Sequence, residues 1–182
     1  MQPTRSDNQL GFNLIEAALV LGIVGLVIGG IFAAWGNVES QQRVRRAADM
    51  TTTIVQQIRT TYAARTTFDA TDTASGATFT QALIAANLIP VEYLSGTTLK
   101  NPWGGDTLIT PNTTGMNVSY SLVRRSDCLK LAQAILSTGK TQGLTDISGQ
   151  AITNTTQFST ISGSICATDP ATLNLFFLLK AN

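Results

Sequence analysis

The residues that most often perform chemistry in proteins are scarce in this sequence. It contains no histidine, which removes the usual general base near neutral pH, the Ser/His and Cys/His nucleophile pairs and the commonest metal ligand. Its aspartates, serines and lysines form no cluster suited to Asp or Ser/Lys hydrolysis. We therefore predict no catalytic residues, no cofactor and no metal site, and we expect a protein that is not an enzyme.

The remaining reactive side chains are two cysteines, Cys128 and Cys166. They have no CxxC spacing and no histidine to complete a zinc site, so a disulfide is the simpler prediction. A bridge between them would close a loop of about 39 residues and contribute at most about 4 kcal/mol to stability. It would also require an oxidising compartment. The alternative is an unbridged, buried pair.

The composition sets limits on the fold and on the partners. With 182 residues and 43% apolar content, the chain has room for one globular domain with a core and an additional segment. The formal net charge is only +1. The overall charge therefore gives no reason to expect nucleic acid or an acidic membrane surface as a partner.

The additional segment lies near the N-terminus, where residues 12–35 read FNLIEAALVLGIVGLVIGGIFAAW. A helix of this length reaches about 36 Å, which is enough to cross a hydrocarbon layer of about 30 Å. Arg5 is the only basic residue before the run, whereas Arg43, Arg45 and Arg46 follow it. The positive-inside rule alone therefore does not place the N-terminus in the cytoplasm.

The residues that open this run differ from a secretory signal peptide, because a polar stretch and a glycine come before the apolar segment and an acid lies inside it. Gly11, Phe12 and Glu16 resemble the glycine, the aromatic residue and the glutamate of the type IV prepilin processing site. The resemblance implies that a membrane peptidase, the prepilin peptidase, cuts after Gly11 and methylates the new amine of Phe12. Residues 1–11 would then be a leader, residues 12–35 a transmembrane and polymerisation segment, and residues 36–182 the globular head.

Glu16 needs a partner if it lies in lipid, since an unpaired carboxylate there costs on the order of 2 to 3 kcal/mol or more. In the family that Glu16 resembles, the terminal amine of a neighbouring subunit neutralises this glutamate, which favours one register during assembly. The alternative is a carboxylate near a helix end that reaches the lipid headgroups.

Beyond Trp35 we expect the helix to continue to about Arg65, with one stripe of residues that packs on the head. The stripe comprises Val44, Ala47, Ala48, Thr51, Ile54, Val55, Ile58 and Tyr62. The arginines of this segment are expected on a solvated face, with contact to an acidic neighbouring subunit as the alternative. They are Arg43, Arg45, Arg46, Arg59 and Arg65.

The rest of the chain predicts short elements. Thr78 and Gln81 match a capping box that would start a short helix before Pro90, and Cys128 to Leu136 has the pattern of another helix. Strands are expected at residues 107–110, 117–123 and 173–179. The segment Asn101-Pro102-Trp103-Gly104-Gly105 is a dense turn signal, expected to hold a buried tryptophan, and it is similar to a segment of the type IVb pilins.

These observations predict an α+β fold of the type IV pilin kind, with a long N-terminal helix packed on an antiparallel sheet and a disulfide-bonded region near the C-terminus. The resemblance implies a structural subunit that is stored in the bacterial inner membrane and assembled by an inner-membrane platform into an extracellular homopolymer for adhesion, aggregation or conjugation-related contact. The alternatives are a minor pilin, a pseudopilin of type II secretion, and a membrane-anchored binding domain that does not polymerise.

Overall fold

The computed structural model describes residues 14–69, 76–152, 163 and 165–180. The chain divides into two units, residues 1–39 and residues 40–182. The long helix α1 (Leu14–Thr61) contributes to both. Its 48 residues agree with the predicted length of about 50.

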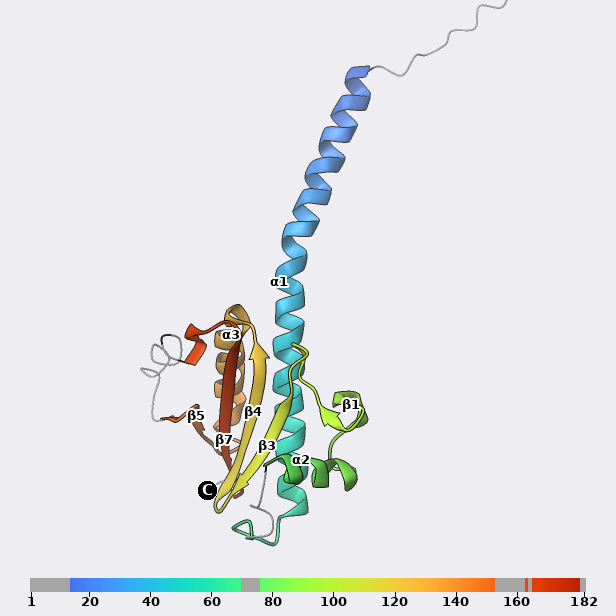
Figure 1. Ribbon diagram of the computed structural model, residues 1–182. Coiled ribbons are helices and arrows are strands. Elements are labelled where there is room, and N and C mark those ends of the chain that lie inside the picture. The colour runs from blue at the N-terminus through green and yellow to red at the C-terminus, as the bar shows by residue number, and fades with distance from the viewer. Residues whose placement is uncertain (1–13, 70–75, 153–162, 164, 181–182) are drawn as a thin grey trace, which may run out of the picture. The chain divides into compact units, whose positions relative to one another are not determined.

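The head, residues 40–182, contains a five-stranded antiparallel sheet with the order β3-β4-β7-β5-β6 (Figure 1). Its strands are β3 (Thr107–Asn112), β4 (Gly115–Val123), β5 (Leu144–Ile147), β6 (Gln150–Ala151) and β7 (Ala171–Leu178). The predicted strand at residues 173–179 is thus confirmed as β7, in the centre of the sheet. Strands β5 and β6 were not predicted, because they are short and rich in polar residues.

Shorter elements complete the head. They are α2 (Gly76–Ala85), the 3-10 helix η1 (Val91–Tyr93), the hairpin of β1 (Leu94–Ser95) and β2 (Thr98–Leu99), α3 (Arg125–Gly139) and the 3-10 helix η3 (Ile165–Ala167). The predicted capping box is wrong, because α2 begins at Gly76 and Thr78 lies inside it. Thr80 fixes this helix to the sheet, since its Oγ1 accepts a hydrogen bond from the Ile109 amide at 2.9 Å.

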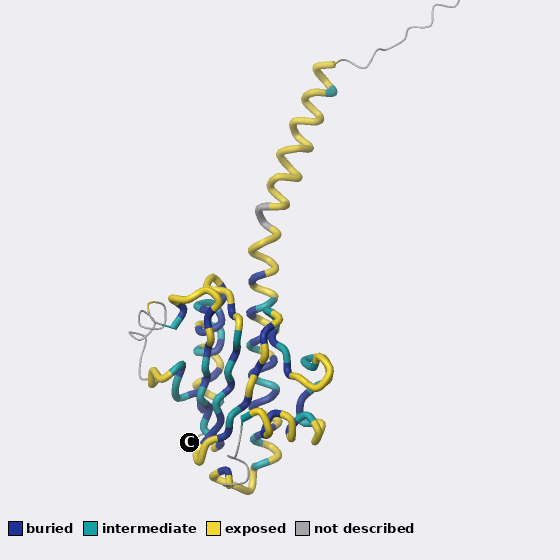
Figure 2. The backbone as a smooth tube through the Cα atoms, in the orientation of Figure 1, coloured by how far each residue is buried: buried dark blue, intermediate teal, exposed yellow. Residues whose placement is uncertain are grey.

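One face of the sheet forms the core of the head. Side chains alternate along β4 and β7, with every second residue buried, as expected for strands with one covered face. The second half of α1 and helix α3 supply the other side of this core, which Figure 2 shows as the dark blue segments of the head. The core contributions of the two helices and the two strands are Val44, Ala47, Met50, Ile54, Val55, Ile58, Leu131, Ile135, Met116, Val118, Tyr120, Leu173, Leu175 and Phe177.

Candidate assembly site

The first half of α1 carries a long apolar surface. Its side chains are exposed nearly throughout, as the yellow tube of Figure 2 shows. The large apolar residues among them are Leu14, Ile15, Leu19, Val20, Leu21, Ile23, Val24, Leu26, Val27, Ile28, Ile31, Phe32, Trp35 and Val38. The helix is long and apolar enough to cross a membrane by length and composition. Such a surface needs lipid or other apolar helices around it.

Glu16 lies in the first turn of this helix and is exposed. It is the acidic residue of an otherwise apolar segment, with Leu14, Leu19 and Val20 as exposed apolar neighbours along the helix. The other two residues of the predicted processing site, Gly11 and Phe12, lie outside the described residues.

The second half of α1 is fixed to the sheet by polar contacts as well as by its apolar stripe. The hydroxyls of Thr51 and Tyr120 are 2.6 Å apart and hydrogen-bonded, and both side chains are buried. Burial strongly raises the pKa of the Tyr120 phenol, which therefore stays neutral. Further along, the guanidinium of Arg59 donates to the Leu178 carbonyl of β7. The predicted stripe is confirmed, and Arg59 leaves the predicted solvated face.

A buried carboxylate, Asp127, joins α1, α3 and the turn after β2. Its Oδ1 accepts a hydrogen bond of 2.6 Å from the Ser40 hydroxyl of α1, and its Oδ2 accepts one of 2.8 Å from the indole Nε1 of Trp103. Lys130 Nζ in turn donates to the Ser40 hydroxyl at 2.8 Å. Three segments distant in the sequence therefore meet at one charged side chain, which we call the Asp127 cluster.

Arg43 completes the Asp127 cluster, because its Nε lies 3.5 Å from Asp127 Oδ2. The side chains are 15% and 0% exposed respectively, which contradicts the predicted solvated position of Arg43. Burial raises the pKa of Asp127, but hydrogen bonds from Ser40, Trp103 and Ser126 and the charge of Arg43 together bring it below its ordinary value. The carboxylate is therefore ionised at neutral pH, and the cluster holds the second half of α1 to α3 and to the turn at Trp103 through charged hydrogen bonds.

The turn that holds Trp103 is built by Asn101, as the sequence predicted. Asn101 Oδ1 accepts from the backbone N–H groups of Trp103 and Gly105, and Asn101 Nδ2 donates to the Ser121 carbonyl. Gly104 has a φ of +84°, which favours glycine. Trp103 is half-buried rather than buried, and its indole N–H donates to the buried carboxylate of Asp127.

The disulfide between Cys128 and Cys166 is present, with a Cα–Cα distance of 5.7 Å. It ties α3 to η3, which precedes the central strand β7. Cys128 directly follows Asp127, so the covalent tie and the Asp127 cluster reinforce the same end of α3.

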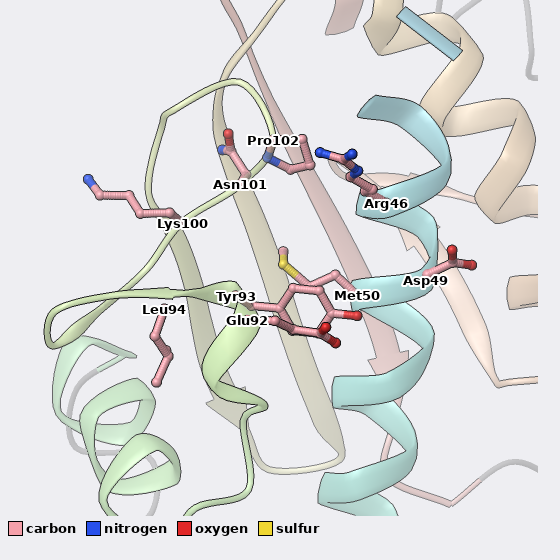
Figure 3. A pocket seen from close by; sticks show the side chains of 9 residues that line it. All are labelled: Arg46, Asp49, Met50, Glu92, Tyr93, Leu94, Lys100, Asn101 and Pro102. Carbon is pink, nitrogen blue, oxygen red and sulfur yellow. The ribbon is translucent and has the colours of Figure 1, made fainter. Parts of the chain in front are cut away.

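A pocket of about 450 Å³ opens beside the second half of α1 (Figure 3). Arg46 extends from the helix toward Pro102, whereas Lys100 and Asp49 extend away from the centre of the pocket. The lining also includes Glu92, so charges of both signs are present and neither dominates. This pocket gives no basis for an anion, cation or nucleotide site.

Comparison with known proteins decides the family. The family model described as PilS N-terminal matches residues 40–177, which is more than half of the chain. The chain belongs to this PilS family of type IV pilins. A search of curated proteins gave no match.

Two solved structures are also similar to this pilin. One is a type IV b pilin from Salmonella typhi, with 21% identity and a TM-score of 0.47, covering 69% of this chain and 93% of that chain. The other is TcpA, a type IV pilin from the El Tor biotype of Vibrio cholerae, with 14% identity and a TM-score of 0.47, covering 75% of this chain and 98% of that chain.

Pilins of this family are not enzymes, so the functional residues of this pilin are those that hold it together and expose its apolar helix. Sequence reasoning identified the apolar helix and the cysteines, but it missed the Asp127 cluster. Asp127 directly precedes the predicted helix at Cys128 to Leu136, which was a weak signal, since acidic residues are favoured near the start of any helix. Its burial depends on Ser40 and Trp103, which lie far away in the sequence.

Proposed function

We propose that this pilin is a structural subunit of a type IV pilus, stored in the bacterial inner membrane and then assembled into an extracellular helical homopolymer. The observation that carries the proposal is the exposed apolar surface of α1, from Leu14 to Val38, in the same chain as a head with its own core. Such a surface suits lipid before assembly and a bundle of identical helices afterwards. If the apolar helices form the inner bundle of the filament, the heads lie on its outside, where they can contact other cells or surfaces for adhesion, aggregation or conjugation.

The processing site belongs to this proposal. Cleavage by the prepilin peptidase after Gly11 would make Phe12 the N-methylated first residue of the mature subunit. The mature helix would then begin at the apolar segment, with Glu16 close to its end. A carboxylate in an apolar bundle requires a cationic partner, and the terminal amine of a neighbouring subunit is the cation we assign to Glu16.

The experiment compares Glu16→Ala with Glu39→Ala in the full chain, since both acids are exposed on α1. We expect Glu16→Ala to reach the membrane and be processed but to give no filaments in material sheared from the cell surface. Glu39→Ala should give filaments at wild-type abundance. The measurement is the amount of subunit in the sheared and membrane fractions.

Two outcomes would count against the proposal. If Glu16→Ala gives as many filaments as the wild type, Glu16 has no role in assembly. Absence of the wild-type subunit from the sheared fraction would favour a membrane-anchored binding domain that does not polymerise. A trace amount of wild-type subunit within filaments of another protein would instead indicate a minor pilin.

A further inference from the structure

The face of the sheet that α1 and α3 leave uncovered holds a shallow groove of about 420 Å³. We call it the sheet-face groove, and its main lining residues are Thr110, Asn112, Asn117, Asn174, Phe176 and Asp146. Four of these lie in one row across four strands, because Thr110 pairs with Asn117, Asn117 with Phe176, and Phe176 with Asp146. The groove therefore has a floor made by paired strands.

Two amides of the sheet-face groove are oriented by one hydroxyl. The Ser119 hydroxyl donates to Asn174 Oδ1 at 2.6 Å and accepts from Asn117 Nδ2 at 3.5 Å. Because a hydroxyl has a single proton, these two hydrogen bonds determine which atom of each side-chain amide remains available to a ligand. Asn174 Nδ2 is left as a donor and Asn117 Oδ1 as an acceptor, on neighbouring strands and on the same face of the sheet.

An aromatic ring lies beside these amides. Phe176 is half-buried, and a Cβ added at Gly115 would lie 2.2 Å from the Phe177 carbonyl oxygen and 2.9 Å from the Cζ of Phe176. Glycine at position 115 therefore makes room for the backbone of β7 and for the Phe176 ring. An aromatic ring with a partly exposed surface attracts C–H groups, whose hydrogen atoms carry a small positive charge.

We propose that the sheet-face groove binds a neutral sugar ring. A sugar presents C–H groups on one face, which suits Phe176, and adjacent hydroxyls on its edge, which suit the donor of Asn174 and the acceptor of Asn117. Asp146 accepts a hydrogen bond from the Gly149 amide through Oδ1 at 2.6 Å, so its second oxygen serves as a further hydroxyl acceptor. A few placed polar groups beside an apolar surface are typical of small-molecule sites.

Other ligands fit the sheet-face groove less well. Its lining contains no lysine or arginine, and Asp146 repels phosphate, so nucleic acid and other anions are disfavoured. A single carboxylate is too little charge for a calcium site. A peptide cannot add there as a strand, because the strands of the floor are already paired with each other.

The test uses the full-length chain in detergent, so that its result is independent of polymerisation. Saturation-transfer NMR would probe galactose, glucose, N-acetylgalactosamine and the acidic sugar N-acetylneuraminic acid. We expect at least one neutral sugar to bind, with the strongest saturation on its ring C–H protons, and the acidic sugar not to bind. Asn174→Ala should weaken binding about tenfold or more, because it removes a polar contact to the ligand.

Thr172→Ala is the matched control, since Thr172 is exposed on the same strand but lies outside the groove. It should leave binding unchanged. Asp146→Asn keeps an acceptor for Gly149 but removes the charge, so it should retain the neutral sugar and admit the acidic one. The proposal is wrong if no neutral sugar binds, if Asn174→Ala and Thr172→Ala have equal effects, or if the acidic sugar binds the wild type as well as a neutral one does.

Discussion

The two halves of α1 have the same backbone conformation but opposite surfaces. From Leu14 to Val38 the large apolar side chains are exposed, whereas from Val44 to Ile58 the large apolar side chains are buried in the head. The second half is held to the sheet by side-chain hydrogen bonds of Thr51 and Arg59. Helix formation alone therefore does not distinguish a segment that packs in the head from one that packs in lipid or against other subunits.

The largest expected effect, complete loss of filaments, comes from placing a charge in the apolar half of α1 and not in its second half. Val24→Lys puts an ammonium in the apolar half, where it costs about 2.5 to 3.5 kcal/mol in a membrane, so we expect loss of membrane retention and of filaments. Gln41→Lys adds the same charge at an exposed position of the second half and should change neither. Cell fractionation measures membrane retention, and shearing measures filament abundance. Equal behaviour of the two variants would contradict the conclusion that only the first half of α1 contacts lipid and neighbouring subunits.

The second prediction concerns the Asp127 cluster. Asp127→Ala leaves the hydroxyl of Ser40, the indole N–H of Trp103 and the charge of Arg43 without their buried acceptor, so we expect a loss of about 3 to 5 kcal/mol in the free energy of unfolding. Lys100→Ala, which breaks the exposed pair with Asp106, should cost less than about 1 kcal/mol. Urea titration of the full chain in detergent compares them. A loss below 1 kcal/mol for Asp127→Ala would show that the cluster contributes little.

The disulfide should have the next largest effect. Cys128 and Cys166 are separated by 38 positions, and the chain-entropy model gives a stabilisation of at most about 4 kcal/mol for a loop of that length. The double variant Cys128→Ser and Cys166→Ser should therefore unfold at lower urea concentration. Because α1 lies outside the closed loop, membrane retention of this variant should be unchanged, and its loss would contradict the independence of the two regions.

The smallest effect is expected from titration of Asp127. Its pKa is lowered in the folded head, so its stabilising contribution is complete above about pH 5 and is lost as the pH falls below its ordinary value of about 3.9. The stability difference between the wild type and Asp127→Asn should therefore shrink in acid. Urea titrations at pH 7 and pH 3 measure it, and a difference that stays constant would mean that Asp127 does not titrate between them.

Much of the fold was predictable because its signals are local. The long apolar run, the 3.6-residue stripe of α1 and the alternation in β4 each depend on near neighbours in the sequence, and all three appear in the structure. The polar strands β5 and β6 were missed because pairing holds them in place, β5 with the central strand β7 and β6 with β5.

The functional residues divide in the same way. The turn at Asn101 and the cysteine pair were predicted from residue types alone. The half-buried position of Arg43 was not predicted, because an arginine beside an apolar stripe is expected in solvent unless the carboxylate that pairs with it is known. The sheet-face groove could not be predicted from the sequence either, since its residues form a row only when the registers of three strand pairs are known.

The intact mass and N-terminal sequence of the subunit recovered from the cell surface by mechanical shearing would test processing and assembly together. We expect a subunit that begins at N-methylated Phe12 and is recovered in filaments. A subunit that retains Met1 and stays in the membrane fraction would contradict both processing and assembly.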